Sequence, residues 1–223
     1  MNILDTFFPK SCLGCRSLGH YICQSCLAGV GAPRQTCPRC GKFSPLGLTH
    51  ANCRSLNGLD GHMAIWNYQG IIKRAITTFK YKYATQVGDE LETCVLKSLG
   101  SIKSPLTKCD CVVPIPLYWY KQNSRGFNQS AQMGRAVANK LGVNYLPGVL
   151  LRQRRVLPQA NLTQLARKQN IKGVFSLRRG IKIPPGSYIL FDDVYTTGST
   201  LQEACRVLKM GGAKKVWGLT IAK

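Results

Sequence analysis

The chain has 223 residues, of which 44% are hydrophobic; this suits one or two packed domains and excludes a wholly disordered chain. It contains no run of about 20 apolar residues, which a transmembrane helix needs. Residues 1–12 also lack the apolar region of a secretory signal. We therefore expect a cytoplasmic protein without membrane insertion.

The charge is strongly positive, because 31 Lys and Arg residues face only 9 Asp and Glu residues, a formal net charge of +22. The 81 residues between Asp110 and Asp192 contain thirteen Lys or Arg and no acid. Such a stretch favours a polyanionic partner, either nucleic acid or a phosphate-rich small molecule. The alternative is a basic solvent-exposed surface with no dedicated partner.

The N-terminal region contains paired cysteines. Two residues between ligands let a tight turn direct both sulfurs at one ion, whereas structural disulfides are rare in the cytosol. Eight candidate ligands follow this spacing and suit one or two structural Zn²⁺ ions: Cys12, Cys15, Cys23, Cys26, Cys37, Cys40, His50 and Cys53. We expect the first four to hold one ion and the last four the other.

The spacing leaves some alternatives open. Interleaved pairing of the four elements is possible, and His50 can instead be an ordinary surface histidine. His20 is a rival ligand, although its place between two pairs favours a bystander. The four remaining cysteines have no paired spacing and are expected in the core: Cys94, Cys109, Cys111 and Cys205.

After a linker around residues 56–61, strands and helices alternate. Hydrophobic spacing and capping residues predict strands at 62–68, 111–115, 188–191 and 216–221, and helices at 70–79, 86–99, 128–141 and 199–210. Asn128 is the expected N-cap of the third helix, and Gly142 ends it. This alternation predicts an α/β fold, a mostly parallel sheet flanked by helices.

The chemistry is concentrated in residues 188–200, where an apolar strand runs into Asp192 and Asp193 and a loop of hydroxyl residues precedes a helix. A helix N-terminus is a ready phosphate site, and carboxylates at a strand end can accept hydrogen bonds from sugar hydroxyls. The arrangement fits a ribose 5-phosphate. Alternatively, the two aspartates merely cap a turn. The order of the pieces resembles the phosphoribosyl-pyrophosphate (PRPP) motif of type I phosphoribosyltransferases.

A second set of residues narrows the resemblance. It comprises Val112 to Pro116, Arg125 to Gln129, Arg152, Gln159, Leu162, Arg167, Asn170 and Gly173 to Phe175. Together with the cysteine pairs, this order is similar to the ComF family of competence proteins. The resemblance covers essentially the whole chain. It implies a double zinc-ribbon module at residues 1–58 and a type I phosphoribosyltransferase-like domain at residues 62–223.

The resemblance also implies roles and partners. Asp192 and Asp193 would act as the catalytic pair and hold the ribose hydroxyls, directly or through Mg²⁺. The phosphate would lie against Thr196, Thr197, Gly198, Ser199 and Thr200. Pyrophosphate would meet Arg125, Arg152 and Arg167, because guanidinium pairs with phosphate bidentately. Expected partners are PRPP or a related ligand, single-stranded DNA and a helicase-like competence protein.

The sequence departs from the family at His50 and Cys53, where two cysteines are usual, and at residues 117–124, where relatives are more basic. There, Tyr118, Trp119 and Tyr120 can stack on bases, close the pocket or join the core. Three functions remain open: a competence factor that binds PRPP and handles single-stranded DNA, an active metabolic phosphoribosyltransferase with an unknown acceptor, and a non-catalytic zinc-module adaptor.

Overall fold

The centre of the molecule is a five-stranded parallel sheet. We describe a computed structural model for residues 9–80, 85–101, 105–117, 128–153 and 171–223. The strand order is β1-β7-β6-β2-β3, and every neighbouring pair is parallel. The strands are β1 (Gly61–Trp66), β2 (Cys111–Pro114), β3 (Asn144–Tyr145), β6 (Ser187–Val194) and β7 (Lys215–Ala222).

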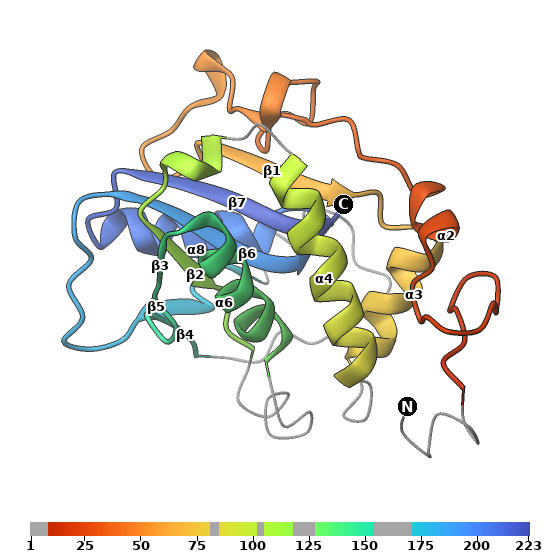
Figure 1. The fold of residues 1–223 in the computed structure, drawn as a ribbon. Helices are drawn as coiled ribbons and strands as arrows, with labels where there is room; N and C mark the ends of the chain where they lie inside the picture. Colours follow the sequence, from red (N-terminus) through yellow and green to blue (C-terminus); the bar gives the residue numbers. More distant parts are fainter. Residues whose placement is uncertain (1–8, 81–84, 102–104, 118–127, 154–170) are drawn as a thin grey trace.

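Helices cover both faces of this sheet (Figure 1). They are α3 (Gly70–Phe79), α4 (Thr85–Ser101), α6 (Gln129–Leu141) and α8 (Ser199–Met210). The side chain of Asn128 accepts hydrogen bonds from the N–H groups of Ser130 and Ala131 and so caps α6. Gly142 ends α6 with φ of 68°, in the left-handed region that favours glycine.

The alternation of side chains along the strands divides the core into two clusters. Ile189 and Phe191 of β6 pack in the cluster formed with α3, α4 and α6. Tyr188 and Leu190 point to the opposite face and pack in the cluster formed with α8. Because successive residues of a strand face opposite sides, an apolar strand such as β6 supplies both cores.

Two smaller features complete the described part of the region that contains the five-stranded sheet. A two-stranded antiparallel sheet joins β4 (Leu150–Arg152) to β5 (Phe175–Leu177), and β5 contacts α8. A 3₁₀ helix, η3 (Pro105–Lys108), precedes β2.

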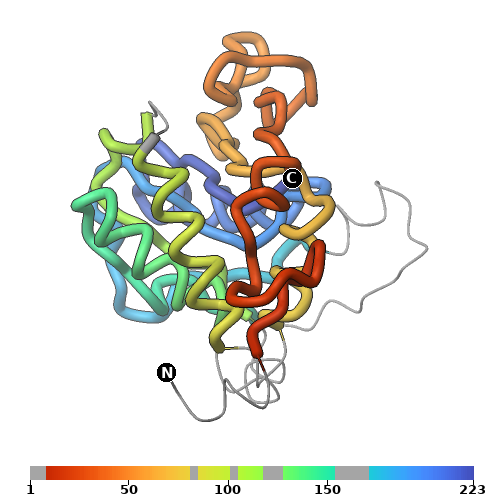
Figure 2. The backbone as a smooth tube through the Cα atoms, turned by 45° about the vertical axis from the view of Figure 1, so that its right-hand side comes forward, coloured from red at the N-terminus to blue at the C-terminus, as the bar shows by residue number. Residues whose placement is uncertain are grey.

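The N-terminal segment has little regular structure and runs along one side of the sheet (Figure 2). It contains the short helix α2 (Gln24–Ala28) and two 3₁₀ helices, η1 (Pro45–Gly47) and η2 (Ala51–Cys53). Its first half contacts α3 and α4, and its second half contacts β1, the loop after β6 and the start of α8. Each half is therefore anchored to a different part of the sheet domain.

The predicted fold class, a mostly parallel sheet flanked by helices, is confirmed. The helices at 70–79 and 199–210 have the predicted bounds, while β6 differs because it continues through the two aspartates to Val194. Register explains the difference, since Asp192 and Val194 still pair with Thr220 and Ala222 of β7. Cys109, Cys111 and Cys205 are buried as expected, and Cys94 is half-buried against the core.

Candidate zinc and phosphoribosyl sites

The first four cysteine ligands converge in the structure. The sulfur atoms of Cys12, Cys15, Cys23 and Cys26 all lie within 4.8 Å of one another. Those of Cys15 and Cys23 are 3.7 Å apart. Tetrahedral zinc with Zn–S bonds of about 2.3 Å requires sulfurs about 3.8 Å apart, so this cluster fits one zinc ion.

The second cluster consists of Cys37, Cys40, His50 and Cys53, whose ligand atoms also lie within 4.8 Å of one another. Nδ1 of His50 is 3.4 Å from the Cys40 sulfur, while its Nε2 is 3.0 Å from the carbonyl oxygen of Phe43. A proton on Nε2 is donated to that carbonyl and leaves Nδ1 free to ligate, which is the usual arrangement at zinc sites. The structure thus groups the eight candidate ligands in the sequential order, and among the described residues His20 belongs to neither cluster.

The first zinc cluster is fastened to the helices of the sheet domain. The Glu90 carboxylate of α4 accepts hydrogen bonds from the N–H groups of Tyr21 (2.7 Å) and Ile22 (3.0 Å). Arg74 of α3 donates to the carbonyl oxygens of Leu13 and Gly14. The cluster thus packs on the outer side of α3 and α4.

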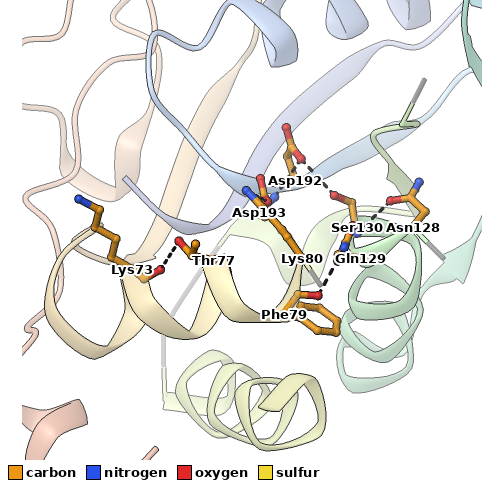
Figure 3. Close-up of polar contacts among 9 residues, drawn as sticks. All are labelled: Lys73, Thr77, Phe79, Lys80, Asn128, Gln129, Ser130, Asp192 and Asp193. Atoms are coloured by element: carbon orange, nitrogen blue, oxygen red, sulfur yellow. Dashed lines mark hydrogen bonds and ion pairs between the residues drawn. The ribbon is translucent and has the colours of Figure 1, made fainter. Parts of the chain in front are cut away.

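The two aspartates of β6 lie beside the C-terminal end of α3 and the first turn of α6 (Figure 3). Lys80 of the α3 cap forms an ion pair with Asp193, with 2.6 Å between Nζ and Oδ2. The Ser130 hydroxyl donates to Oδ1 of Asp192 at 3.1 Å, and the N–H of Asp193 donates to the same oxygen at 2.9 Å. Both carboxylates are therefore held by groups that favour their charged form.

The environment nevertheless makes Asp192 hard to ionise. Burial of its carboxyl group, together with the charge of Asp193, raises the pKa of Asp192 to about 7. The hydrogen bond from Ser130 and the charge of Lys80 act in the opposite direction and lower this pKa. The carboxyl group is therefore poised to exchange a proton near neutral pH, as is common at functional sites.

The loop after β6 leads directly into α8. Gly198 is the N-cap of α8 with φ of 74°, a left-handed conformation that glycine adopts without strain. The hydroxyl groups of Thr197 and Ser199 are 2.8 Å apart, and the Ser199 N–H donates to the Thr197 hydroxyl. The predicted order of strand, acid pair, glycine loop and helix is thus present, with Thr200 in the first turn of α8.

The second zinc cluster contacts this loop. The Pro38 carbonyl oxygen, between Cys37 and Cys40, accepts hydrogen bonds from the Tyr195 hydroxyl (3.3 Å) and from the side-chain amide of Gln202 (3.5 Å). The Tyr195 ring also stacks on His62 of β1, with ring centroids 3.8 Å apart. The zinc-binding turn and the loop between β6 and α8 therefore position each other.

Comparison with known proteins agrees with these features. A family model described as a double zinc ribbon domain matches residues 3–54. Competence protein F of Haemophilus influenzae is 28% identical over 227 residues, which cover 97% of this chain and 99% of that protein. The DNA utilization protein YhgH of Escherichia coli K12 is 27% identical over 223 residues, which cover 95% of this chain and 96% of that protein. The resemblance to the ComF family is confirmed.

A solved structure of glutamine PRPP amidotransferase from B. subtilis is also similar to this ComF-like chain. The match covers 65% of this chain and 30% of the amidotransferase chain, with 19% sequence identity and a TM-score of 0.43.

Within the described residues, no helix has the length and apolar character to cross a bilayer.

The three arginines that the ComF resemblance singled out have different outcomes. Arg125 and Arg167 lie outside the described residues, as do Tyr118, Trp119 and Tyr120. Arg152 ends β4 close enough to Asp192 for the two charges to interact. Within the described part of the chain, its buried Nε has no hydrogen-bond partner. This unsatisfied donor marks a position where a ligand oxygen would be stabilised.

Sequence reasoning missed three residues around the site. Lys80 and Ser130 reach the aspartates from two helices, and Glu203 of α8 accepts hydrogen bonds from Arg206 and from the N–H of Gly173. No local pattern identifies the contacts of Lys80 and Ser130 with the aspartates, or that of Glu203 with Gly173, because each joins segments far apart in sequence.

Proposed function

We propose that this ComF-like protein binds PRPP, or a related phosphoribosyl ligand, with Mg²⁺ at the edge of the sheet around Asp192 and Asp193. In this proposal the protein supports natural competence by handling single-stranded DNA in the cytoplasm, together with a helicase-like partner. The observation that carries the proposal is the acid pair of β6 followed at once by a glycine-capped helix N-terminus, with Lys80, Ser130 and Arg152 converging on the acids.

The carboxylates support binding of the sugar. Asp192 and Asp193 lie at the carboxyl end of a central parallel strand, where open α/β sheets bind their ligands. Carboxylate oxygens suit Mg²⁺, which would supply charge neutralisation for a pyrophosphate group. Lys80 would either remain on Asp193 or move to the phosphates when the ligand arrives.

The loop supports binding of the 5-phosphate. Residues Thr196 to Thr200 surround the N-terminus of α8, where unpaired N–H groups and the helix dipole favour an anion. Arg152, with its unpartnered buried Nε, would donate to a phosphate oxygen, and we extend the same role to Arg125 and Arg167.

The charge distribution and the relatives support the DNA-handling part of the proposal. The formal charge of +22, with no acid between Asp110 and Asp192, suits a phosphate backbone. The relatives carry the names Competence protein F and DNA utilization protein. Free thiols in paired spacing as zinc ligands fit a reducing compartment such as the cytoplasm.

An enzymatic role is the second candidate, favoured by the raised pKa of Asp192. In that case an acceptor nucleophile displaces pyrophosphate from C1 of the ribose. The residues described here would position the sugar and stabilise the leaving group electrostatically, and no covalent intermediate on the protein is required.

The test is a calorimetric titration of PRPP with Mg²⁺ into the wild type and into the Asp192→Asn/Asp193→Asn double variant. We expect saturable binding to the wild type and at least a tenfold loss in the double variant. Asp89→Asn, which neutralises one exposed carboxylate on α4, is the control for a change of surface charge and should bind normally. Wild-type protein that takes up no PRPP would refute the proposed ligand.

A parallel titration with a single-stranded oligonucleotide at several salt concentrations addresses the DNA role. Because phosphate contacts release counterions, we expect affinity to fall steeply as salt rises. An affinity that does not depend on salt, or an absence of binding at low salt, would argue against the nucleic-acid part of the proposal while leaving the PRPP site intact.

A further inference from the structure

A groove separates the second zinc cluster from the start of α8. It has a volume of about 860 Å³ and is lined on one side by the zinc-binding turn at residues 36–41. The other side consists of Thr196, Thr197 and Ser199 of the motif together with residues of α8. Pockets of about 300–1,000 Å³ hold whole small-molecule ligands, so this groove has room for much more than one phosphate group.

The groove and the pocket beside Asp193 are separate cavities that share no described lining residue. Asp193 lines a small separate pocket with Lys80 and Ser130, and neither aspartate lines the groove. A ligand with its ribose over the aspartates and its 5-phosphate at Thr196–Ser199 would therefore present that phosphate to the groove. A group attached to the far side of the phosphate would have space to enter.

The charges of the groove favour a second anion. Among the described residues that line it, four have cationic side chains: Arg39, Lys172, Arg206 and Lys223. Glu203 is the single carboxylate side chain among these described lining residues, and it already accepts hydrogen bonds from Arg206 (2.8 and 3.0 Å) and from the N–H of Gly173 (2.7 Å). The zinc cluster adds about −1 when three thiolates and a neutral imidazole hold one ion. The balance remains positive.

We infer that this groove binds a second phosphate group, joined through a pyrophosphate link to the ribose 5-phosphate at the motif. Arg39 of the zinc-binding turn and Lys172, which precedes Gly173, would contact that phosphate. The inference rests on the proposed phosphoribosyl site and deepens it. The ligand class is an extended ribose phosphate of the ADP-ribose type, with the adenosine part filling the remainder of the groove.

The hydrogen-bonding groups of the groove suit such a ligand. The Arg39 guanidinium donates a hydrogen bond to the Ser55 hydroxyl at 3.4 Å. A hydrogen bond from Arg39 to a phosphate oxygen would be stronger, because the phosphate carries a negative charge. Hydroxyl and amide groups from Thr49, Asn57 and Gln202 line the same space and can meet sugar or base atoms.

The experiment compares ribose 5-phosphate with ADP-ribose, which carries the same sugar phosphate with the proposed extension. We expect ADP-ribose to bind the wild type at least tenfold more tightly. Arg39→Gln and Lys172→Gln should each remove most of this gain and leave the affinity for ribose 5-phosphate unchanged. Lys214→Gln, an exposed lysine outside the groove, is the charge-matched control.

The outcomes separate the two proposals. Equal affinity for the two ligands, or a gain that persists in both groove variants, would overturn the groove assignment and leave the phosphoribosyl site standing. Failure of both PRPP and ribose 5-phosphate to bind would overturn the proposed site itself. Because Arg39 lies within the zinc-binding turn, the zinc content of Arg39→Gln must equal that of the wild type, and Lys172→Gln tests the groove without altering that turn.

Discussion

The hydroxyl group of Tyr195 donates a hydrogen bond to the carbonyl oxygen of Pro38 across 3.3 Å. Tyr195 opens the loop that follows β6, and Pro38 lies between two ligands of the second zinc cluster. The zinc-binding turn is thereby a structural support for the loop that we propose binds phosphate. The first cluster has no such contact among the described residues, since its hydrogen bonds to the sheet domain are with Glu90 of α4 and Arg74 of α3.

Loss of the second zinc ion should therefore weaken ligand binding more than loss of the first. We expect Cys37→Ser/Cys40→Ser to lower PRPP affinity at least tenfold, because the Pro38 carbonyl loses its fixed position. The matched variant Cys12→Ser/Cys15→Ser should lose one zinc ion and retain PRPP affinity within about threefold. Metal analysis and calorimetry on the same samples check both. Equal losses in the two variants would contradict this division.

Tyr195→Phe isolates the hydrogen bond from the metal. The ring and its stacking on His62 remain, while the bond to Pro38 is lost. A net hydrogen bond is worth about 1 kcal/mol, so we expect the free energy of unfolding to fall by roughly that amount. PRPP affinity should fall several-fold with zinc content unchanged. Tyr68→Phe is the matched control. If it lowers stability and PRPP affinity as much as Tyr195→Phe does, the hydrogen bond of Tyr195 to Pro38 has no specific effect on the loop.

Glycine is required at residue 47 by close packing as well as by backbone conformation. Gly47 has φ of 71°, and an added Cβ would overlap the main-chain oxygen of His62 in β1. Gly41 has nearly the same φ, 73°, with no atom within 4 Å of its Cβ position. Gly41→Ala should therefore cost about 1–2 kcal/mol of stability from backbone strain alone. Gly47→Ala should cost clearly more in denaturant unfolding, and equal costs would refute the packing argument.

Glu90 fastens the first zinc cluster to α4. Replacing it with alanine leaves the N–H groups of Tyr21 and Ile22 without their acceptor. Hydrogen bonds to a charged group contribute about 1.5–3 kcal/mol, so Glu90→Ala should destabilise the protein by about 2 kcal/mol. Asp89→Ala, the adjacent exposed acid, should change stability by less than about 0.5 kcal/mol in the same urea titration. Similar values for both would show that Glu90 is not an anchor.

Stability should depend on pH through Asp192. Its pKa in the folded protein is raised to about 7 from an ordinary value of 3.8. The folded state therefore binds more protons than the unfolded state between these values, and this contribution to stability is lost as pH rises from about 4 to about 7. Asp192→Asn should remove this part of the pH dependence.

The corresponding measurement is urea unfolding at pH 5 and pH 8. We expect the wild type to lose on the order of 1–2 kcal/mol more than Asp192→Asn over this interval, a figure reduced for partial solvent exposure. Asp89→Asn should follow the wild type. Identical slopes for the wild type and Asp192→Asn would contradict the raised pKa.

The sequence predicted those features that depend on neighbouring residues. The zinc clusters follow from local spacing, and β6 and α8 follow from an apolar run, a glycine cap and a helical repeat. It missed β3, β4 and β5, which have only two or three residues and too little pattern to recognise. It also missed Lys80 and Ser130, because their role comes from the tertiary packing of α3 and α6 around β6.

The position of β7 in the sheet has a consequence for biosynthesis. Among the described strands β1 pairs only with β7, yet 156 residues separate Asp60 from its hydrogen-bonded partner Val216. On the ribosome, each zinc cluster can close as soon as its own short segment emerges. By contrast β1, whose six residues are all buried in the finished fold, stays without its partner until almost the whole described chain has been made. The nascent protein therefore passes through a stage with folded metal modules and an exposed apolar strand, a state that calls for chaperone protection.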